Sequence, residues 1–292
     1  MTRRTRGFTL VELIISMTVL AILGAAAMRT LSTSAKLNEK QEAGQRSRAV
    51  ARGSLARLAS ELRAVPVPGP GAPVSMVEFA TADSVQARVP YLLALFCGVG
   101  AGDLTLSVLP RDTTFGSNAD HAGLLVRLPS GQFAWEPTAA PTAGTASVCD
   151  GGSGPGVRTL PGGTVIRLAA PPGGTLATLF GTLRPGTAVY LAKRVRYAFA
   201  PLDGSIALTR AWYDGAGTRL GREVIATPFA TGTQLFYWAG SQVLLPPVLG
   251  TDLVRVSGLT LSLRGQSAEL VRLGIAPTAE YATSIHFQNR AQ

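Results

Sequence analysis

The side chains that could carry out chemistry are few in this sequence and lie far apart along it. Its two histidines, His121 and His286, are isolated, and neither belongs to a zinc-binding His-Glu-x-x-His pattern or to a Gly-x-Ser-x-Gly pattern. A nucleophile and a base could still meet across the fold, but no spacing in the chain indicates such a pair. We therefore expect a protein that is not an enzyme and that uses no cofactor.

Two other segments have compositions that occur in ligand sites. Asp112, Asn118 and Asp120 could offer oxygen atoms to calcium, but their spacing differs from that of known calcium loops. The glycine-rich segment at residues 151–163 could imitate a phosphate-binding loop, but no Gly-Lys-Ser or Gly-Lys-Thr follows it. We expect a surface loop at 151–163 and no metal site.

Cys97 and Cys149 are the only cysteines, and both lie far from the apolar N-terminal segment. If that segment exports the rest of the chain, the two thiols meet an oxidising compartment and can pair. A bridge would close a loop of roughly 50 residues, which is worth about 4 kcal/mol in the chain-entropy model. Two unpaired buried thiols are the alternative, but the sequence favours the disulfide.

Glu12 is the most informative carboxylate because of where it lies. It falls inside an apolar run at residues 8–28, directly after the basic residues Arg3, Arg4 and Arg6. As a helix, this run would rise about 31 Å, which is the thickness of a hydrocarbon core. The preceding arginines predict that the N-terminus stays in the cytoplasm and that the body lies across the membrane. A bare carboxylate in the bilayer costs roughly 3 kcal/mol, so Glu12 should have a compensating partner.

The stretch GFTLVEL at residues 7–13, which follows a short basic leader at 1–7, resembles the processing site of type IV prepilins and type II secretion pseudopilins. The resemblance implies that a prepilin peptidase cuts after Gly7 and methylates the new amine of Phe8. It also implies that Glu12 pairs with the Phe8 amine of a neighbouring subunit, since a charge in low dielectric is tolerable when it is paired. The implied partners are prepilin peptidase, other pilins or pseudopilins through the N-terminal helix, and the bacterial inner membrane before assembly into a pilus or pseudopilus.

An ordinary secretory signal is the main alternative for this N-terminus. Ala25-Ala26-Ala27 could be a cleavage site, with a mature chain that starts at Met28. This interpretation leaves Glu12 unexplained, and the helical pattern continues beyond Met28.

One long helix is expected to position the N-terminal residues. No proline occurs between residues 1 and 65, and an apolar stripe with spacings of three and four follows one helix face in the second half. We expect a helix over 8–65, with 8–28 spanning the membrane, and a total length of roughly 85 Å. The prolines that begin at Pro66 end it. The stripe consists of Ala51, Leu55, Leu58, Leu62 and Val65.

The remaining residues, 66–292, predict a β-rich globular domain with a variable middle region at 66–187. Short apolar segments, several of them alternating, recur between Gly- and Pro-containing turns. We therefore expect an α+β, pilin-like fold in which the long helix packs on an antiparallel sheet. The expected strands are 85–89, 91–97, 104–109, 124–128, 132–135, 165–168, 188–199, 206–213, 234–238, 254–264 and 284–288, with a hairpin turn at 202–205.

The pattern of residues 188–290 is similar to that of PilW-type minor pilins and J-type minor pseudopilins. It comprises a strand, hairpin and strand ("VRYAFAPLDGSIALTRAWY"), an aromatic strand ("GTQLFYWAG"), a long strand ("VRVSGLTLSLRG") and a closing "YATSIHFQNR". The resemblance implies a subunit that primes or caps the tip of a type IV pilus, or else a J-like subunit of a type II secretion system. The sequence does not decide between the two.

The net charge of +10 adds nucleic acid as a secondary candidate partner, in a pilus subunit for DNA uptake. Acidic residues are few and the arginines are scattered, so the charge alone does not predict this role. The candidate contacts are Arg46, Arg48, Arg52 and Arg57 on the helix and Lys193, Arg194 and Arg196 on a strand.

Overall fold

A computed structural model gives the fold of the chain. It describes residues 9–67, 74–100, 103–109, 120–128, 130–145, 147–150, 163–169, 183–265, 279–287 and 289–290. Within these residues, a long N-terminal helix leads into a head built on a 14-stranded sheet whose pairings are antiparallel. The expected α+β, pilin-like fold is thus confirmed.

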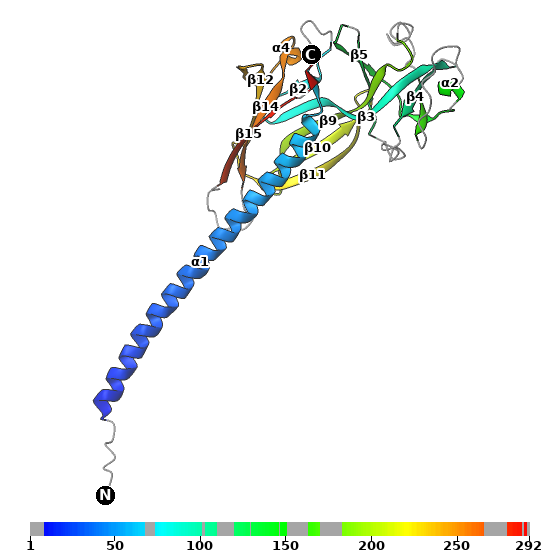
Figure 1. The fold of residues 1–292 in the computed structure, drawn as a ribbon. Coiled ribbons are helices and arrows are strands. Elements are labelled where there is room, and N and C mark those ends of the chain that lie inside the picture. Colours follow the sequence, from blue (N-terminus) through cyan, green and yellow to red (C-terminus); the bar gives the residue numbers. More distant parts are fainter. Residues whose placement is uncertain are drawn as a thin grey trace.

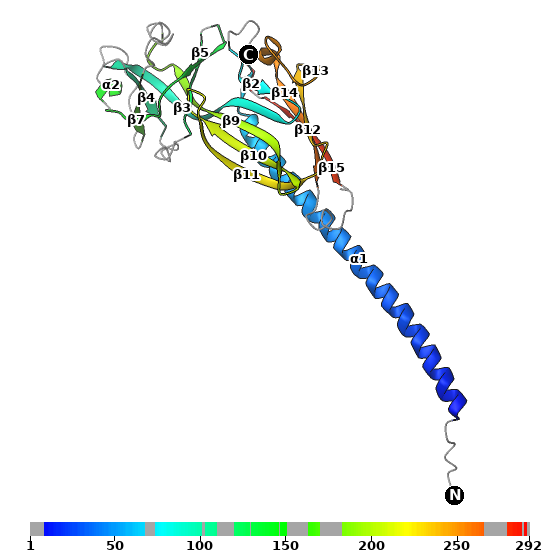
Figure 2. The same cartoon turned by 180° about the vertical axis from the view of Figure 1, so that it is seen from behind.

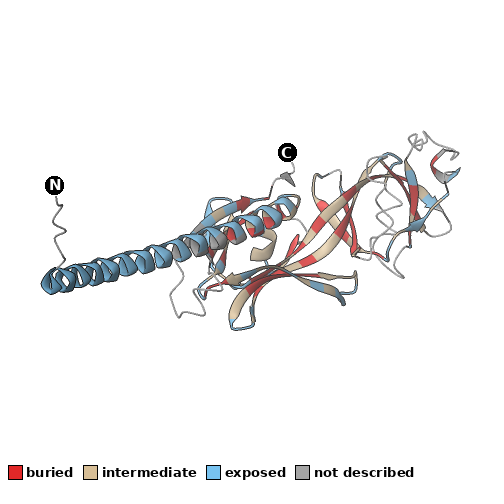
Figure 3. Ribbon diagram, turned by 90° about the horizontal axis from the view of Figure 1, so that it is seen from below, coloured by how far each residue is buried: buried red, intermediate tan, exposed pale blue. Residues whose placement is uncertain are grey.

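The helix α1 (Leu10–Leu62) begins at the N-cap Thr9 and has no proline to interrupt it. Its N-terminal part lies outside the head, and its C-terminal part lies against the sheet (Figure 1). Figure 3 shows the same division as exposed and buried residues along one rod. Of the expected stripe, Ala51, Leu58, Leu62 and Val65 are fully buried, so among the described residues packing of the helix begins where this stripe begins.

The sheet has two parts that meet under α1. In one part the order is β11-β10-β9-β3-β4-β8-β7, and in the other β14 lies between β12 and β15. Only the pair Phe229–Gly265 joins β11 to β14 among the described residues. The strands are β1 (Pro66–Val67), β2 (Val77–Ala80), β3 (Ser84–Gly100), β4 (Asp103–Val108), β5 (Gly123–Arg127), β6 (Phe133–Pro137), β7 (Thr142–Ala143), β8 (Thr164–Ala169), β9 (Ala188–Leu202), β10 (Ser205–Tyr213), β11 (Arg219–Phe229), β12 (Gln234–Ala239), β13 (Gln242–Leu244), β14 (Gly258–Gly265), β15 (Ala279–His286) and β16 (Asn289–Arg290).

The main core lies between α1 and these two parts of the sheet. Leu58 and Leu62 of the helix meet apolar side chains from β9, β10, β12, β14 and β15 there. Tyr237 is fully buried in this core, and its hydroxyl donates to the carbonyl oxygens of Thr81 (2.8 Å) and Ser84 (2.9 Å). Phe236 and Trp238, its neighbours on β12, are partly exposed, as the strand's alternation requires.

A second core lies in a part of the head that we call the distal lobe: β4, β7, β8, the short helix α2 (Ser147–Asp150) and residues 92–100 of β3. Twelve buried apolar residues form this core: eight belong to β3, β4 and β8 of the lobe, and four to the adjoining strands β5 and β9. The long strands β3 and β9 run through both cores. In Figure 2 the lobe projects to the side of the head away from β12–β15. Much of the middle region 66–187 therefore builds this sideways extension.

The structure corrects three of the expected strands. The strands expected at 85–89 and 91–97 are one strand, β3, in which a bulge between Pro90 and Leu92 accommodates the proline. The strand expected at 254–264 starts only at Gly258, because Asp252–Arg255 form a helical turn, α4, with an Asp252–Arg255 ion pair of 3.1 Å.

The expected hairpin turn between β9 and β10 is confirmed. Leu202 pairs with Ser205. Asp203 and Gly204 between them both have positive φ, 48° and 75°. This backbone twist matches that of the flanking strands. Asp and Gly tolerate it at low cost.

Candidate functional site

The first turn of α1 is a reciprocal capping box made by Thr9 and Glu12. The Glu12 amide donates to Thr9 Oγ1 (3.3 Å), and the Thr9 amide donates to Glu12 Oε2 (3.2 Å). The Thr9 hydroxyl also donates to the same carboxylate oxygen (3.2 Å). Two amides that a helix start would leave unpaired are thereby satisfied. The carboxylate also lies at the positive end of the helix dipole.

The surroundings of Glu12 are apolar for many residues. Leu10–Glu39 is long and apolar enough to cross a membrane, and none of this stretch is buried inside the chain's own fold. The hydroxyls of Ser16, Thr18 and Thr30 donate to carbonyl oxygens three or four residues earlier, so they need no water. Between Leu10 and Met28, Glu12 is the one ionisable side chain.

The N-terminal sequence has a recognised counterpart. Residues 2–28 match the family model of the prokaryotic N-terminal methylation motif. This matched segment contains the Thr9–Glu12 box and the start of α1, and it is the segment that resembles the N-terminus of type IV prepilins and pseudopilins. A search of curated proteins and a search of solved structures each found no match. The assignment therefore depends on the N-terminal segment.

The motif carries three consequences for this pilin-like chain. It implies processing by prepilin peptidase and assembly with other pilins. Together with the apolar helix, it is consistent with residence in the inner membrane and then in a pilus. Pilins are structural subunits and generally not enzymes. Gly7 and Phe8, the expected processing residues, lie outside the described residues.

A polar network fastens α1 to the sheet. Arg210 of β10 donates to Glu61 of α1 (3.2 Å) and lies 3.4 Å from Glu223 of β11, which also pairs with Arg57 of α1 (2.5 Å). The Tyr197 hydroxyl donates to the same Glu61 oxygen. Burial alone would lower the pKa of Arg210, but Glu61, Tyr197 and Glu223 together raise it. In the sequence, the only sign of this network is a glutamate, Glu61, beside the apolar stripe of α1.

The two histidines have structural or surface positions. His121 is 3% exposed, with Nδ1 2.9 Å from the Tyr91 hydroxyl and Nε2 2.7 Å from Thr138 Oγ1. Burial lowers the pKa of His121 to about 4, so its ring is neutral at pH 7. His286 is exposed at the end of β15.

The described residues contain no group of three or more His, Cys, Asp or Glu side chains that could hold a metal. Asp120, one of the candidate calcium ligands, pairs instead with Lys193 at 3.1 Å. The other two candidates, Asp112 and Asn118, lie outside the described residues, as do residues 151–162 of the expected glycine-rich loop.

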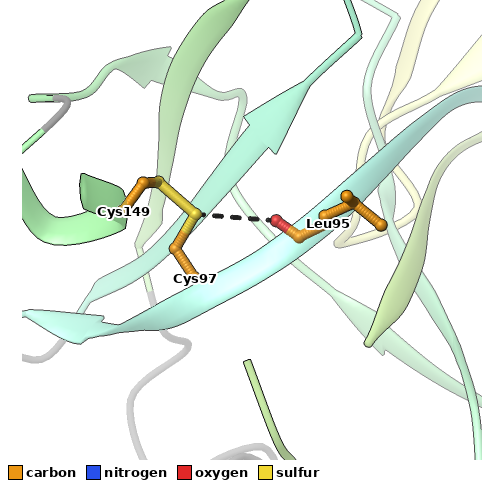
Figure 4. Close-up of a disulfide and its surroundings, with 3 residues drawn as sticks. All are labelled: Leu95, Cys97 and Cys149. Carbon is orange, nitrogen blue, oxygen red and sulfur yellow. Dashed lines mark hydrogen bonds between the residues drawn. A yellow bond between two sulfur atoms is a disulfide. The ribbon is translucent and has the colours of Figure 1, made fainter. Parts of the chain in front are cut away.

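A disulfide joins Cys97 of β3 to Cys149 of α2, and their Cα atoms are 4.9 Å apart. Both cysteines are buried in a small cluster with Val165 of β8. Cys97 Sγ also lies 3.9 Å from the carbonyl oxygen of Leu95 (Figure 4). The bond therefore holds the short helix α2 to the sheet of the distal lobe.

The strand cations that the sequence offered for nucleic acid are engaged within the head. Lys193 pairs with Asp120, and Arg194 pairs with Glu78 (2.8 Å). Arg196 donates to Ser84 Oγ (3.1 Å) and stacks over a phenylalanine ring. These contacts use positive charge that would otherwise be available to bind the phosphate groups of a nucleic acid. Arg48 and Arg52 on α1 are exposed.

Proposed function

We propose that this chain is a minor pilin that prepilin peptidase cuts after Gly7 and methylates on Phe8, and that it then enters the tip of a type IV pilus. The observation that carries the proposal is the capping box, which puts the Glu12 carboxylate at the very start of an uncovered apolar helix. Cleavage after Gly7 would leave an amine four residues before that carboxylate in the sequence. The corresponding amine of a neighbouring subunit can then neutralise the Glu12 carboxylate.

Assembly exchanges one set of contacts for another. In the membrane, the exposed apolar residues of α1 meet lipid, and Glu12 is partly satisfied by its own Thr9. In a filament, the same residues meet neighbouring helices, and the carboxylate gains a full positive charge. Because a buried ion pair depends on geometry more than an apolar contact does, the pair selects the register of the helices.

The shape of the head supports a sparse role at the tip. The distal lobe extends sideways from the part of the head that packs on α1 (Figures 1 and 2). Identical heads this broad would have to interlock at every repeat of a filament. A subunit that is present once or a few times has no such constraint.

The alternative is that the chain is a J-like subunit of a type II secretion pseudopilus, because the same first turn and long helix would suit assembly there. A deletion strain separates the two functions. Loss of surface pili and twitching supports the pilus role, whereas loss of exoprotein export with normal pili supports the secretion role.

N-terminal sequencing and mass analysis of the mature chain test the proposal. We expect methylated Phe8 as the first residue in wild-type cells and an uncut chain when the peptidase is deleted. A mature chain that starts at Met28 would instead establish a secretory signal and remove the filament role.

A further inference from the structure

A groove between α1 and β11 is shaped to receive another molecule. Its volume is about 480 Å3, within the range of about 300–1,000 Å3 of ligand pockets. Figures 1 and 2 show α1 and β11 side by side. Its lining includes Ala49, Gly53 and Ser54 from the helix and Val224, Ile225 and Ala226 from the strand.

The strand side of the groove offers unpaired backbone. β11 pairs with β10 along its length, but on its other side only Phe229 is paired among the described residues. The edge from Arg219 to Ala226 therefore has N–H and C=O groups that an extended chain could use. Leu220 and Val224 on the same strand are 45% and 48% exposed, although both are large and apolar.

The helix side of the groove leaves room for a backbone to approach. Ala49 and Gly53 are both exposed, and a Cβ atom built on Gly53 would meet nothing within 4 Å. A glycine inside a helix costs stability, so its presence at an open position is not explained by packing within this chain.

The charge around the groove is positive. Arg48 and Arg52 on α1 and Arg219 and Arg222 on β11 are exposed, and Arg57 lines the groove itself. The nearby carboxylate of Glu223 is already shared between Arg57 and Arg210. An occupant should therefore be acidic. A second copy of this chain, with a net charge of +10, would be repelled.

We propose that the groove binds an extended, acidic and partly apolar segment of a neighbouring filament subunit, which lies along the open edge of β11. Apolar side chains of the segment contact Val224 and Ile225, and its carboxylates meet the surrounding arginines. A polypeptide fits better than nucleic acid, because the groove wall combines apolar side chains with backbone donors and acceptors. The identity of the partner as a filament subunit rests on the proposed function, but the groove chemistry does not.

Binding of a designed peptide to the full-length chain in nonionic detergent tests the proposal. The probe is the fluorescein-labelled peptide DVEIDVE, and the matched probes are KVKIKVK and an all-acidic peptide without apolar residues. We expect measurable binding by the first probe alone, and binding that weakens as salt rises. Equal binding by the all-acidic peptide, or tighter binding by a single-stranded oligonucleotide, would overturn the proposal.

Two variants locate the binding. Gly53→Gln fills the groove and raises helix propensity, and Val224→Asp places a negative charge at its edge; each should weaken DVEIDVE binding at least tenfold. The control Ala56→Gln lies at an exposed position of the same helix that does not line the groove, and it should change binding less than twofold.

Unchanged binding by both variants would overturn the proposal. So would a melting temperature of Gly53→Gln well below that of Ala56→Gln, since it would mean that another part of this chain fills the groove. These outcomes are independent of whether Phe8 is methylated, so a failure here leaves the filament role to its own test.

Discussion

Arg210 of β10 donates to Glu61 of α1 at 3.2 Å, although 149 residues separate them in the chain. The Arg210 side chain is 11% exposed and that of Glu61 is 25% exposed, so the pair lies at the border of the main core. It is the place where the rod-like helix is tied to the sheet by charge as well as by apolar contact.

Removing one partner of this pair should destabilise the head strongly. We expect Arg210→Leu to lower the free energy of unfolding by about 3 kcal/mol, because Glu61 would be left beside the core without its cation. The double variant Glu61→Leu with Arg210→Leu should recover much of this loss. Urea unfolding of the detergent-solubilised chain measures both.

The control for this experiment is Arg255→Leu, which breaks the exposed Asp252–Arg255 pair of α4 and should cost less than about 1 kcal/mol. If Arg210→Leu lowers the free energy of unfolding no more than the control does, the network does not hold α1 to the sheet.

His121 should make the head less stable in mild acid. Because its folded pKa of about 4 lies below the ordinary value of 6.5, the unfolded chain binds a proton between these values that the folded chain does not. Stability should therefore fall as pH drops from 6.5 towards 4, by roughly 3 kcal/mol over the whole interval. Tyr91 contacts the His121 ring, and burial raises the pKa of its hydroxyl, so that hydroxyl stays protonated throughout this range.

The variant His121→Gln isolates this effect. It lacks the titrating ring, so the difference between its stability and that of the wild type should shrink as pH falls. Thermal melts of both proteins at pH 7, 6, 5 and 4 measure the difference. A difference that stays constant across the series would mean that the imidazole is not held neutral in the fold.

The Cys97–Cys149 bond should stabilise the distal lobe and leave the main core nearly unchanged. In the chain-entropy model the loop it closes is worth about 4 kcal/mol, which is an upper value for this local effect. The variant with serine at both positions should exchange its β4 and β8 amides faster with deuterium, whereas β12 and β14 should exchange as in the wild type. Uniformly faster exchange would show that the two cores unfold as one unit.

The sequence predicted those elements whose pattern is local. The apolar run, the stripe that ends at Val65 and the Asp203-Gly204 turn each follow from neighbouring residues, and the structure has all three. Strand β11 was missed because Gly221 and Pro228 lie within it and its apolar residues do not alternate regularly with polar ones. An edge strand tolerates such residues, since one side has no ladder to complete.

What could not be predicted depends on contacts between distant parts of the chain. Glu61 and Arg210 look like two surface charges until the fold brings them together. Likewise, Lys193 and Arg194 look like a basic strand, yet Asp120 and Glu78 neutralise them. The same distinction holds for the candidate sites. The Thr9–Glu12 box is formed by four consecutive residues and can be recognised in the sequence, whereas the groove beside β11 is formed by distant segments and cannot.

Glu12 itself carries the central prediction of the filament model. Glu12→Leu removes the carboxylate from the capping box and leaves a sister subunit's amine without its partner, which in low dielectric costs several kcal/mol. We expect much less of this variant in sheared filaments than in membranes, as measured by immunoblotting. Thr9→Val removes only the hydroxyl, costs the helix start about 1 kcal/mol and should reduce incorporation mildly. Ser16→Ala, whose hydroxyl bonds only within the helix, serves as the control and should behave as the wild type. Should Glu12→Leu be incorporated as well as Ser16→Ala, the carboxylate would have no part in assembly.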